Sequence, residues 1–128
     1  MTSYAGLIDS GNASVNLSML LNVDTGVPSA LGGVTVLFFS ASNFGSQIGA
    51  SPTNNITLDT IPQTWEPASV SAPIPVNTRW LLTQVAYSNV TLGGHPGYVD
   101  FGRLDIVPEP ATALLLAAGS LGLLVRRR

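Results

Sequence analysis

Residues 13 to 23 alternate between apolar and polar side chains, and this pattern restricts the fold more than any other feature of the sequence. Apolar residues occupy every second position, with serine or asparagine at most positions between them and Leu20 as the one exception. A period of two over this length predicts a β-strand with one face in a core and the other in water. Asp24, Thr25 and Gly26 then predict a turn.

The rest of the chain as far as residue 107 also favours strands. Residues 33 to 42 are apolar on both faces and rich in β-branched and aromatic residues, which is typical of a central strand. Residues 65 to 76 contain three prolines, which remove donors from a ladder, so we expect an edge strand at best. The other predictions are a loop over 43–55, a short strand at 56–59, a long strand over 78–90 and a last strand over 98–107.

These elements together predict the fold class. No stretch before residue 111 shows apolar residues at helical spacing. About six strands at this spacing predict an all-β domain, an antiparallel β-sandwich over residues 1–107.

The composition excludes several kinds of function. The chain has no cysteine and no lysine, and before the last residues two arginines accompany six acidic residues. Nucleic-acid binding needs clustered cations, so we exclude it. Without cysteine there is no disulfide, thiolate metal site or cysteine nucleophile.

The C-terminus has a different composition. Pro108, Glu109 and Pro110 end the last strand, and residues 111–125 carry no charge and are mostly alanine and leucine. A helix of this length spans about 22 Å, less than the roughly 30 Å hydrocarbon core, so it suits a transient transmembrane anchor. The final Arg126, Arg127 and Arg128 would stay in the cytoplasm and leave residues 1–107 outside.

Residues 108–128 resemble the PEP-CTERM sorting signal in all three parts: the Pro-Glu-Pro motif, the apolar helix and the arginine cluster. The resemblance implies an exosortase partner that recognises Pro108, Glu109 and Pro110 and removes the helix. It also implies insertion in the inner membrane of a Gram-negative-type bacterium, followed by display at the cell surface or in an exopolysaccharide matrix. The same tail occurs on some ice-binding proteins, but a sorting address implies no ice binding.

Enzymatic chemistry is not expected. His95 is the only histidine and lies in a glycine-rich loop, and the sequence has no Gly-x-Ser-x-Gly elbow. Asp100 and Asp105 are five residues apart, so on a regular strand they point to opposite faces and form no catalytic pair. Only a bulge at Gly102 would change that.

The segment from Gly97 to Leu104 resembles the last strand of jelly-roll, galactose-binding-like domains. That resemblance implies a jelly-roll-like sandwich in which Asp100 helps to hold a structural calcium; no other cofactor is expected. Calcium prefers several oxygen ligands, and the partners in that family come from first strands that this chain lacks. The alternative is that Asp100 caps a turn or faces solvent.

Four aromatic residues, Trp65, Trp80, Tyr87 and Tyr98, could stack on sugar rings. We expect Trp80 to pack in the core and Trp65, beside a predicted edge, to lie at the surface. Two hypotheses for the exported domain follow. It is a structural or adhesive matrix protein, or it is a carbohydrate-binding module that contacts extracellular polysaccharide through Trp65.

The start of the chain does not look like a leader. An exported protein is expected to begin with a basic segment and an apolar run, and residues 1 to 10 contain neither. We therefore expect the start to lie inside a longer gene, so that the sandwich is incomplete; the alternative is export by another route.

Overall fold

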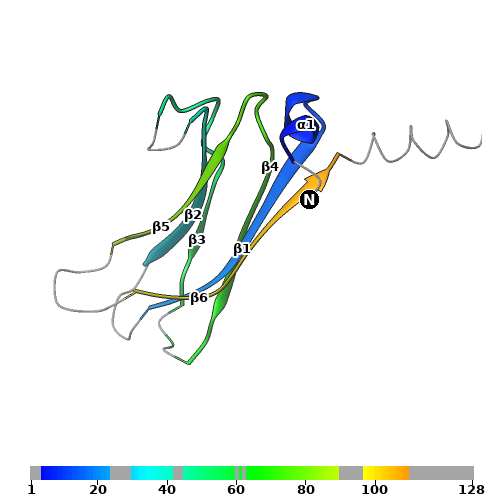
Figure 1. The fold of residues 1–128 in the computed structure, drawn as a ribbon. Coiled ribbons are helices and arrows are strands. Elements are labelled where there is room, and N and C mark those ends of the chain that lie inside the picture. Colours follow the sequence, from blue (N-terminus) through cyan, green and yellow to red (C-terminus); the bar gives the residue numbers. More distant parts are fainter. Residues whose placement is uncertain are drawn as a thin grey trace, which may run out of the picture.

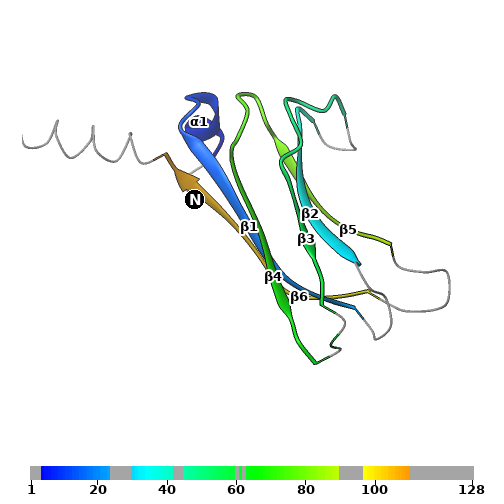
Figure 2. The same cartoon turned by 180° about the vertical axis from the view of Figure 1, so that it is seen from behind.

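A computed structural model of the chain describes residues 4–23, 30–41, 45–59, 61, 63–89 and 97–109. Within them the chain forms one short helix and six strands that make two three-stranded antiparallel sheets. Figures 1 and 2 show the sheets as two layers, as the strand pattern predicted for an all-β sandwich. The predicted apolar helix at 111–125 and the cluster Arg126, Arg127 and Arg128 lie outside the described residues.

The first sheet has the order β4-β1-β6. Its central strand is β1 (Ala13–Val23), with the bounds that the alternation predicted. The strand β4 (Glu66–Pro73) is an edge, as its prolines predicted, and β6 (Gly97–Pro108) is the other edge. On β1 the side chains of Val15, Leu17, Met19 and Leu21 point inward, and the outer face carries Ser14, Asn16, Ser18 and Leu20.

The second sheet has the order β3-β2-β5. Its centre is β2 (Leu31–Phe39), as the apolar character of both faces predicted. The flanking strands are β3 (Thr53–Thr57) and β5 (Trp80–Ser88). The strand β3 begins within the predicted loop over 43–55, because Thr53 and Asn54 pair with Thr35 and Val34 of β2, respectively.

The core fills the space between β1 and β4 on one side and β2 on the other. Its largest fully buried side chains include Phe38, Leu17 and Leu21. Each such side chain stabilises the fold by about 1.5–3 kcal/mol. The buried apolar residues are Ile8, Ala13, Val15, Leu17, Leu21, Val23, Ala30, Val34, Val36, Phe38, Phe39, Leu58, Ala68 and Ile74.

The side of the sandwich where β5 of one sheet faces β6 of the other is less tightly packed. Neither strand contributes a residue to that buried set among the described residues. Val99 and Leu104 pair with the inward-facing Leu21 and Leu17 of β1, yet they are 47% and 42% exposed. The two sheets therefore pack tightly on the β3–β4 side and diverge along β5 and β6.

One element was not predicted, and one expectation was wrong. The element that was not predicted is the helix α1 (Tyr4–Asp9), which lies beside the end of β6 in Figure 1. This helix has only six residues and buries only Ile8, so the sequence shows no repeating apolar pattern that would predict it. Trp80 does not pack in the core but is 56% exposed, because the inward positions of β5 are Leu81, Thr83, Val85 and Tyr87.

Candidate functional site

A β-bulge in β6 shapes the outer face of the first sheet. The register of β6 against β1 shifts between Ser18 and Leu20, so that Phe101 and Gly102 together lie opposite Met19. Phe101 has a φ of 51°, a left-handed conformation that costs a residue with a side chain roughly 1–2 kcal/mol. The carboxylate of Asp100 accepts a hydrogen bond from the Phe101 N–H at 2.7 Å and supports this backbone.

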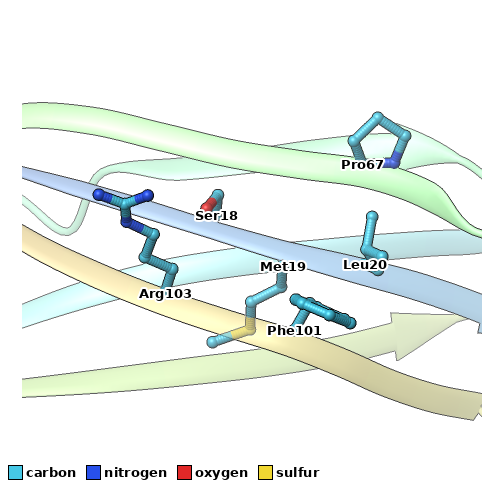
Figure 3. A pocket seen from close by; sticks show the side chains of 6 residues that line it. All are labelled: Ser18, Met19, Leu20, Pro67, Phe101 and Arg103. Carbon is cyan, nitrogen blue, oxygen red and sulfur yellow. The ribbon is translucent and has the colours of Figure 1, made fainter.

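The bulge turns Phe101 outward, where it is 78% exposed. Figure 3 shows its ring beside Met19 and Leu20, in a shallow concavity on the outer face. The concavity is lined by Ser18, Met19, Leu20, Pro67, Phe101 and Arg103. It combines an aromatic surface with a hydroxyl and a guanidinium, whose charge is partly balanced because Arg103 Nε lies 2.6 Å from Asp105 Oδ2.

The bulge also changes the arrangement of the two aspartates in β6. Asp100 lies opposite Leu20 and Asp105 opposite Asn16, so both are on the outer face and not on opposite faces as a regular strand would place them. Their partners in β1 are four positions apart, which corresponds to roughly 13 Å along the strand. Paired glycosidase carboxylates lie about 5–9.5 Å apart, and Arg103 engages one of these two.

The sequence predicted that Asp100 helps to hold a calcium ion, and the structure shows which groups lie near its carboxylate. The Asp100 carboxylate is directed to the Phe101 N–H. No three acidic or histidine side chains within the described part of the chain gather closely enough to hold a metal ion. Calcium takes six to eight oxygen ligands, which include backbone carbonyls, and the structural calcium at Asp100 stays a prediction.

The aromatic residues considered for sugar stacking do not form one platform. Trp65 is 41% exposed just before β4, and Tyr98 is 46% exposed on the outer face of the first sheet. Trp80 lies on the outer face of the other sheet, opposite Phe39. Tyr87 points between the sheets, and its ring and hydroxyl contact β6. The sequence analysis did not select Phe101, although the possible bulge at Gly102 was a signal for its exposure.

Two acidic residues, Asp59 and Glu66, lie close together at the start of β4, the edge strand of the first sheet opposite β6. The Asp59 carboxylate accepts hydrogen bonds from the Thr64 hydroxyl at 2.7 Å and the Ile61 N–H at 2.9 Å, and these lower the pKa of Asp59. Burial raises the pKa of Glu66, and the nearby Asp59 carboxylate adds to this effect. Glu66 accepts a hydrogen bond from the Asp59 N–H at 2.9 Å, so both acids serve the turn before β4.

The end of β6 lies against the start of β1. Pro108 pairs with Ala13, and the Glu109 N–H donates a hydrogen bond to the Asn12 carbonyl oxygen at 2.8 Å. The Ser14 hydroxyl donates a further hydrogen bond to the Glu109 carboxylate. Pro108 is exposed and Glu109 is half-buried, whereas Pro110 lies outside the described residues.

Residues 107–128 match the family model described as the PEP-CTERM protein-sorting motif. This chain carries a PEP-CTERM sorting motif. The match confirms the resemblance of the tail and covers the Pro-Glu-Pro residues, two of which the structure places at the end of β6. Neither a curated protein nor a solved structure matches the chain.

The PEP-CTERM motif therefore follows the folded domain without a spacer. The family model begins at Val107, which pairs with Ser14 inside the first sheet. Among the described residues no helix has the length and apolar character needed to cross a membrane. The predicted transmembrane segment lies beyond them.

Proposed function

We propose that this chain is an exported protein that an exosortase processes at Pro108, Glu109 and Pro110 and that then resides at the cell surface or in the extracellular matrix. The match of residues 107–128 to the PEP-CTERM motif carries this proposal. In it, the apolar segment 111–125 inserts transiently in the inner membrane and Arg126, Arg127 and Arg128 stay in the cytoplasm.

The exported domain has a structural or adhesive role in this proposal. The outer face of the first sheet supports it, because β1 and β4 present hydroxyl and amide groups there instead of charges. Asn16 and Ser71 illustrate this surface, with the Ser71 hydroxyl donating to the Asn16 side-chain oxygen at 2.6 Å. Such neutral groups hydrogen-bond to water and to other polar matrix components without needing a counter-charge.

The sorting proposal is tested by replacing Pro108, Glu109 and Pro110 with alanines in the native host. We expect the full-length chain to accumulate in the membrane fraction, with loss of the shortened product from the surface. An arginine-cluster variant, with Arg126, Arg127 and Arg128 replaced by serine, serves as a second arm and should also impair retention and processing. Wild-type size and location in the alanine variant would contradict the proposal.

A second candidate function is carbohydrate binding, and the concavity at Phe101 favours it. An exposed aromatic ring can contact the apolar face of a sugar, while Ser18 and Arg103 can bind its hydroxyls. Trp65 is a separate exposed aromatic candidate. This function requires a measurable glycan ligand, which the adhesive role does not.

Glycan-array binding by the full chain in detergent distinguishes the two functions. Phe101→Ala and Trp65→Ala test the two aromatic sites, and Trp80→Ala is the matched control, because Trp80 is also exposed but lies on the other sheet. Loss of binding in the first or second variant, with binding kept in the control, supports the carbohydrate-binding function. No binding to any polysaccharide favours the structural role, and turnover of a substrate panel would contradict our expectation that the chain is not an enzyme.

A further inference from the structure

The ladder between β1 and β6 does not stop at the sorting motif but continues into it. Pro108 occupies a paired position opposite Ala13. The Glu109 N–H then donates to the Asn12 carbonyl oxygen at 2.8 Å. The first two residues of the Pro-Glu-Pro motif are thus held by the domain itself.

A side-chain contact adds to this backbone pairing. Val107 pairs with Ser14, and Glu109 is two residues farther along, so the period of the strand returns it to the same face. The Ser14 hydroxyl donates to the Glu109 carboxylate there. Because the acceptor is ionised, this is among the stronger kinds of hydrogen bond, and both residues are half-buried.

An enzyme that cleaves or transfers a peptide must bind the backbone and side chains of its recognition segment. Glu109 cannot present its N–H and carboxylate to such an enzyme while Asn12 and Ser14 occupy them. When local opening is fast relative to cleavage, the rate follows the population of the opened state. The contacts at Glu109 therefore determine how much of the motif is available.

We propose that Ser14 is a positioning residue for the sorting reaction, which it controls by holding Glu109 against β1 until the motif is released. The proposal rests on the proposed exosortase function. Ser14 touches neither the enzyme nor the reacting bond; it sets the fraction of chains whose motif is free. A residue far from the motif in sequence would thus tune its processing.

The test is a series of Ser14 variants of the full chain, followed by pulse–chase in the native host. Ser14→Ala removes the donor, and we expect processing to be about ten- to a hundred-fold faster, as loss of one hydrogen bond to a charged group implies. Ser14→Asp repels Glu109 and should be at least as fast. Ser14→Lys provides an opposite charge and should slow processing, and Ser14→Thr retains the hydroxyl and should restore the wild-type rate.

Two controls separate this role from a general loosening of the domain. Ser71→Ala removes another serine hydroxyl from the same face, one that donates to the neutral Asn16 side chain, and should leave the rate unchanged. Thermal unfolding of each full chain in detergent shows whether the domain remains folded. A rate that follows the unfolding temperature and ignores the sign of the charge at residue 14 would overturn the proposal.

The outcomes also distinguish this inference from the function on which it rests. Equal processing rates across the Ser14 series, together with complete loss of processing when Pro108, Glu109 and Pro110 become alanine, would refute the role of Ser14 and leave the sorting function intact. Normal processing in the alanine variant would refute both. Opposite effects of Ser14→Asp and Ser14→Lys would establish the positioning role.

Discussion

The Tyr87 hydroxyl donates a hydrogen bond to the Tyr98 carbonyl oxygen, and so β5 of one sheet is joined to β6 of the other. This contact lies on the side of the sandwich where the sheets diverge and where β5 and β6 bury no apolar side chain completely. The Tyr87 ring lies over Gly97, the first residue of β6. We infer that this contact helps to hold the open side of the sandwich together.

Gly97→Ala should destabilise the domain. A Cβ at residue 97 would lie 2.6–2.8 Å from three ring atoms of Tyr87, and the half-buried ring would have to move. We expect a loss of about 1–3 kcal/mol in the free energy of unfolding, as for other overpacking substitutions. Chemical denaturation measures it.

Gly102→Ala is the matched control for that substitution. A Cβ at residue 102 meets only Met19 Cε, at an ordinary 3.8 Å. The free energy of unfolding should change by less than about 0.5 kcal/mol. Equal losses at the two glycines would refute the role given to the Tyr87 ring.

Phe101→Gly should stabilise the domain, because glycine adopts the positive φ of this position without a steric penalty and the side chain that is lost is largely exposed. We expect a gain of about 0.5–1 kcal/mol in the free energy of unfolding, measured by denaturation. If the concavity binds a glycan, the same variant should lose that binding.

Asn77→Gly provides the comparison for Phe101→Gly. Asn77 also has a positive φ, 68°, but it lies in the turn before β5 and away from the concavity. It should gain stability, to a smaller extent because asparagine tolerates this conformation, and leave glycan binding unchanged. A loss of stability in Phe101→Gly would show that the ring contributes more to folding than its exposure implies.

Acid should weaken the attachment of α1. Arg79 binds Asp9 through two hydrogen bonds of 2.9 and 2.8 Å, and these lower the pKa of Asp9. A lowered carboxyl pKa gives stability that is present above the usual value of about 3.9 and is lost as the pH falls through the folded-state pKa. Asp9→Asn should remove this contribution, so its unfolding temperature should depend less on pH below about 4 than that of the wild type.

Glu66 should behave in the opposite way. Burial raises its pKa, so the folded state favours the protonated acid, and the ionised form costs stability above the folded-state pKa. Glu66→Gln resembles the protonated form and should raise the unfolding temperature at pH 7. The difference from wild type should shrink as the pH falls through the raised pKa, and a lower unfolding temperature at pH 7 would contradict this account.

The sequence predicted those parts of the fold that depend on local periodicity. The alternation over 13–23 gave both bounds of β1, because one face of that strand is buried along nearly its whole length. The exposure of Trp80 could also have been predicted, since a period of two over the strand places Leu81, Val85 and Tyr87 on one face and Trp80 on the other. Its size and apolar character favoured the core incorrectly.

Contacts between distant segments could not be predicted in this way. Ser14 and Glu109 are 95 residues apart, and neither has a local pattern that indicates the other. Phe101 becomes exposed only because of the register shift against β1. The identity of the sorting motif needed no structure, whereas its attachment to β1 depends on the tertiary fold.

The place of β1 between β4 and β6 also has a consequence for the order of folding. Synthesis of β1 precedes that of both its partners, and the last of them, β6, ends at the sorting motif. Contacts of such long sequence separation form slowly. Until residues 97–109 pair with β1, one edge of the central strand has no hydrogen-bonded partner and the sorting motif is not attached to the domain. The pairing of β6 that completes the first sheet and the attachment of Pro108 and Glu109 to the start of β1 are therefore one step of folding.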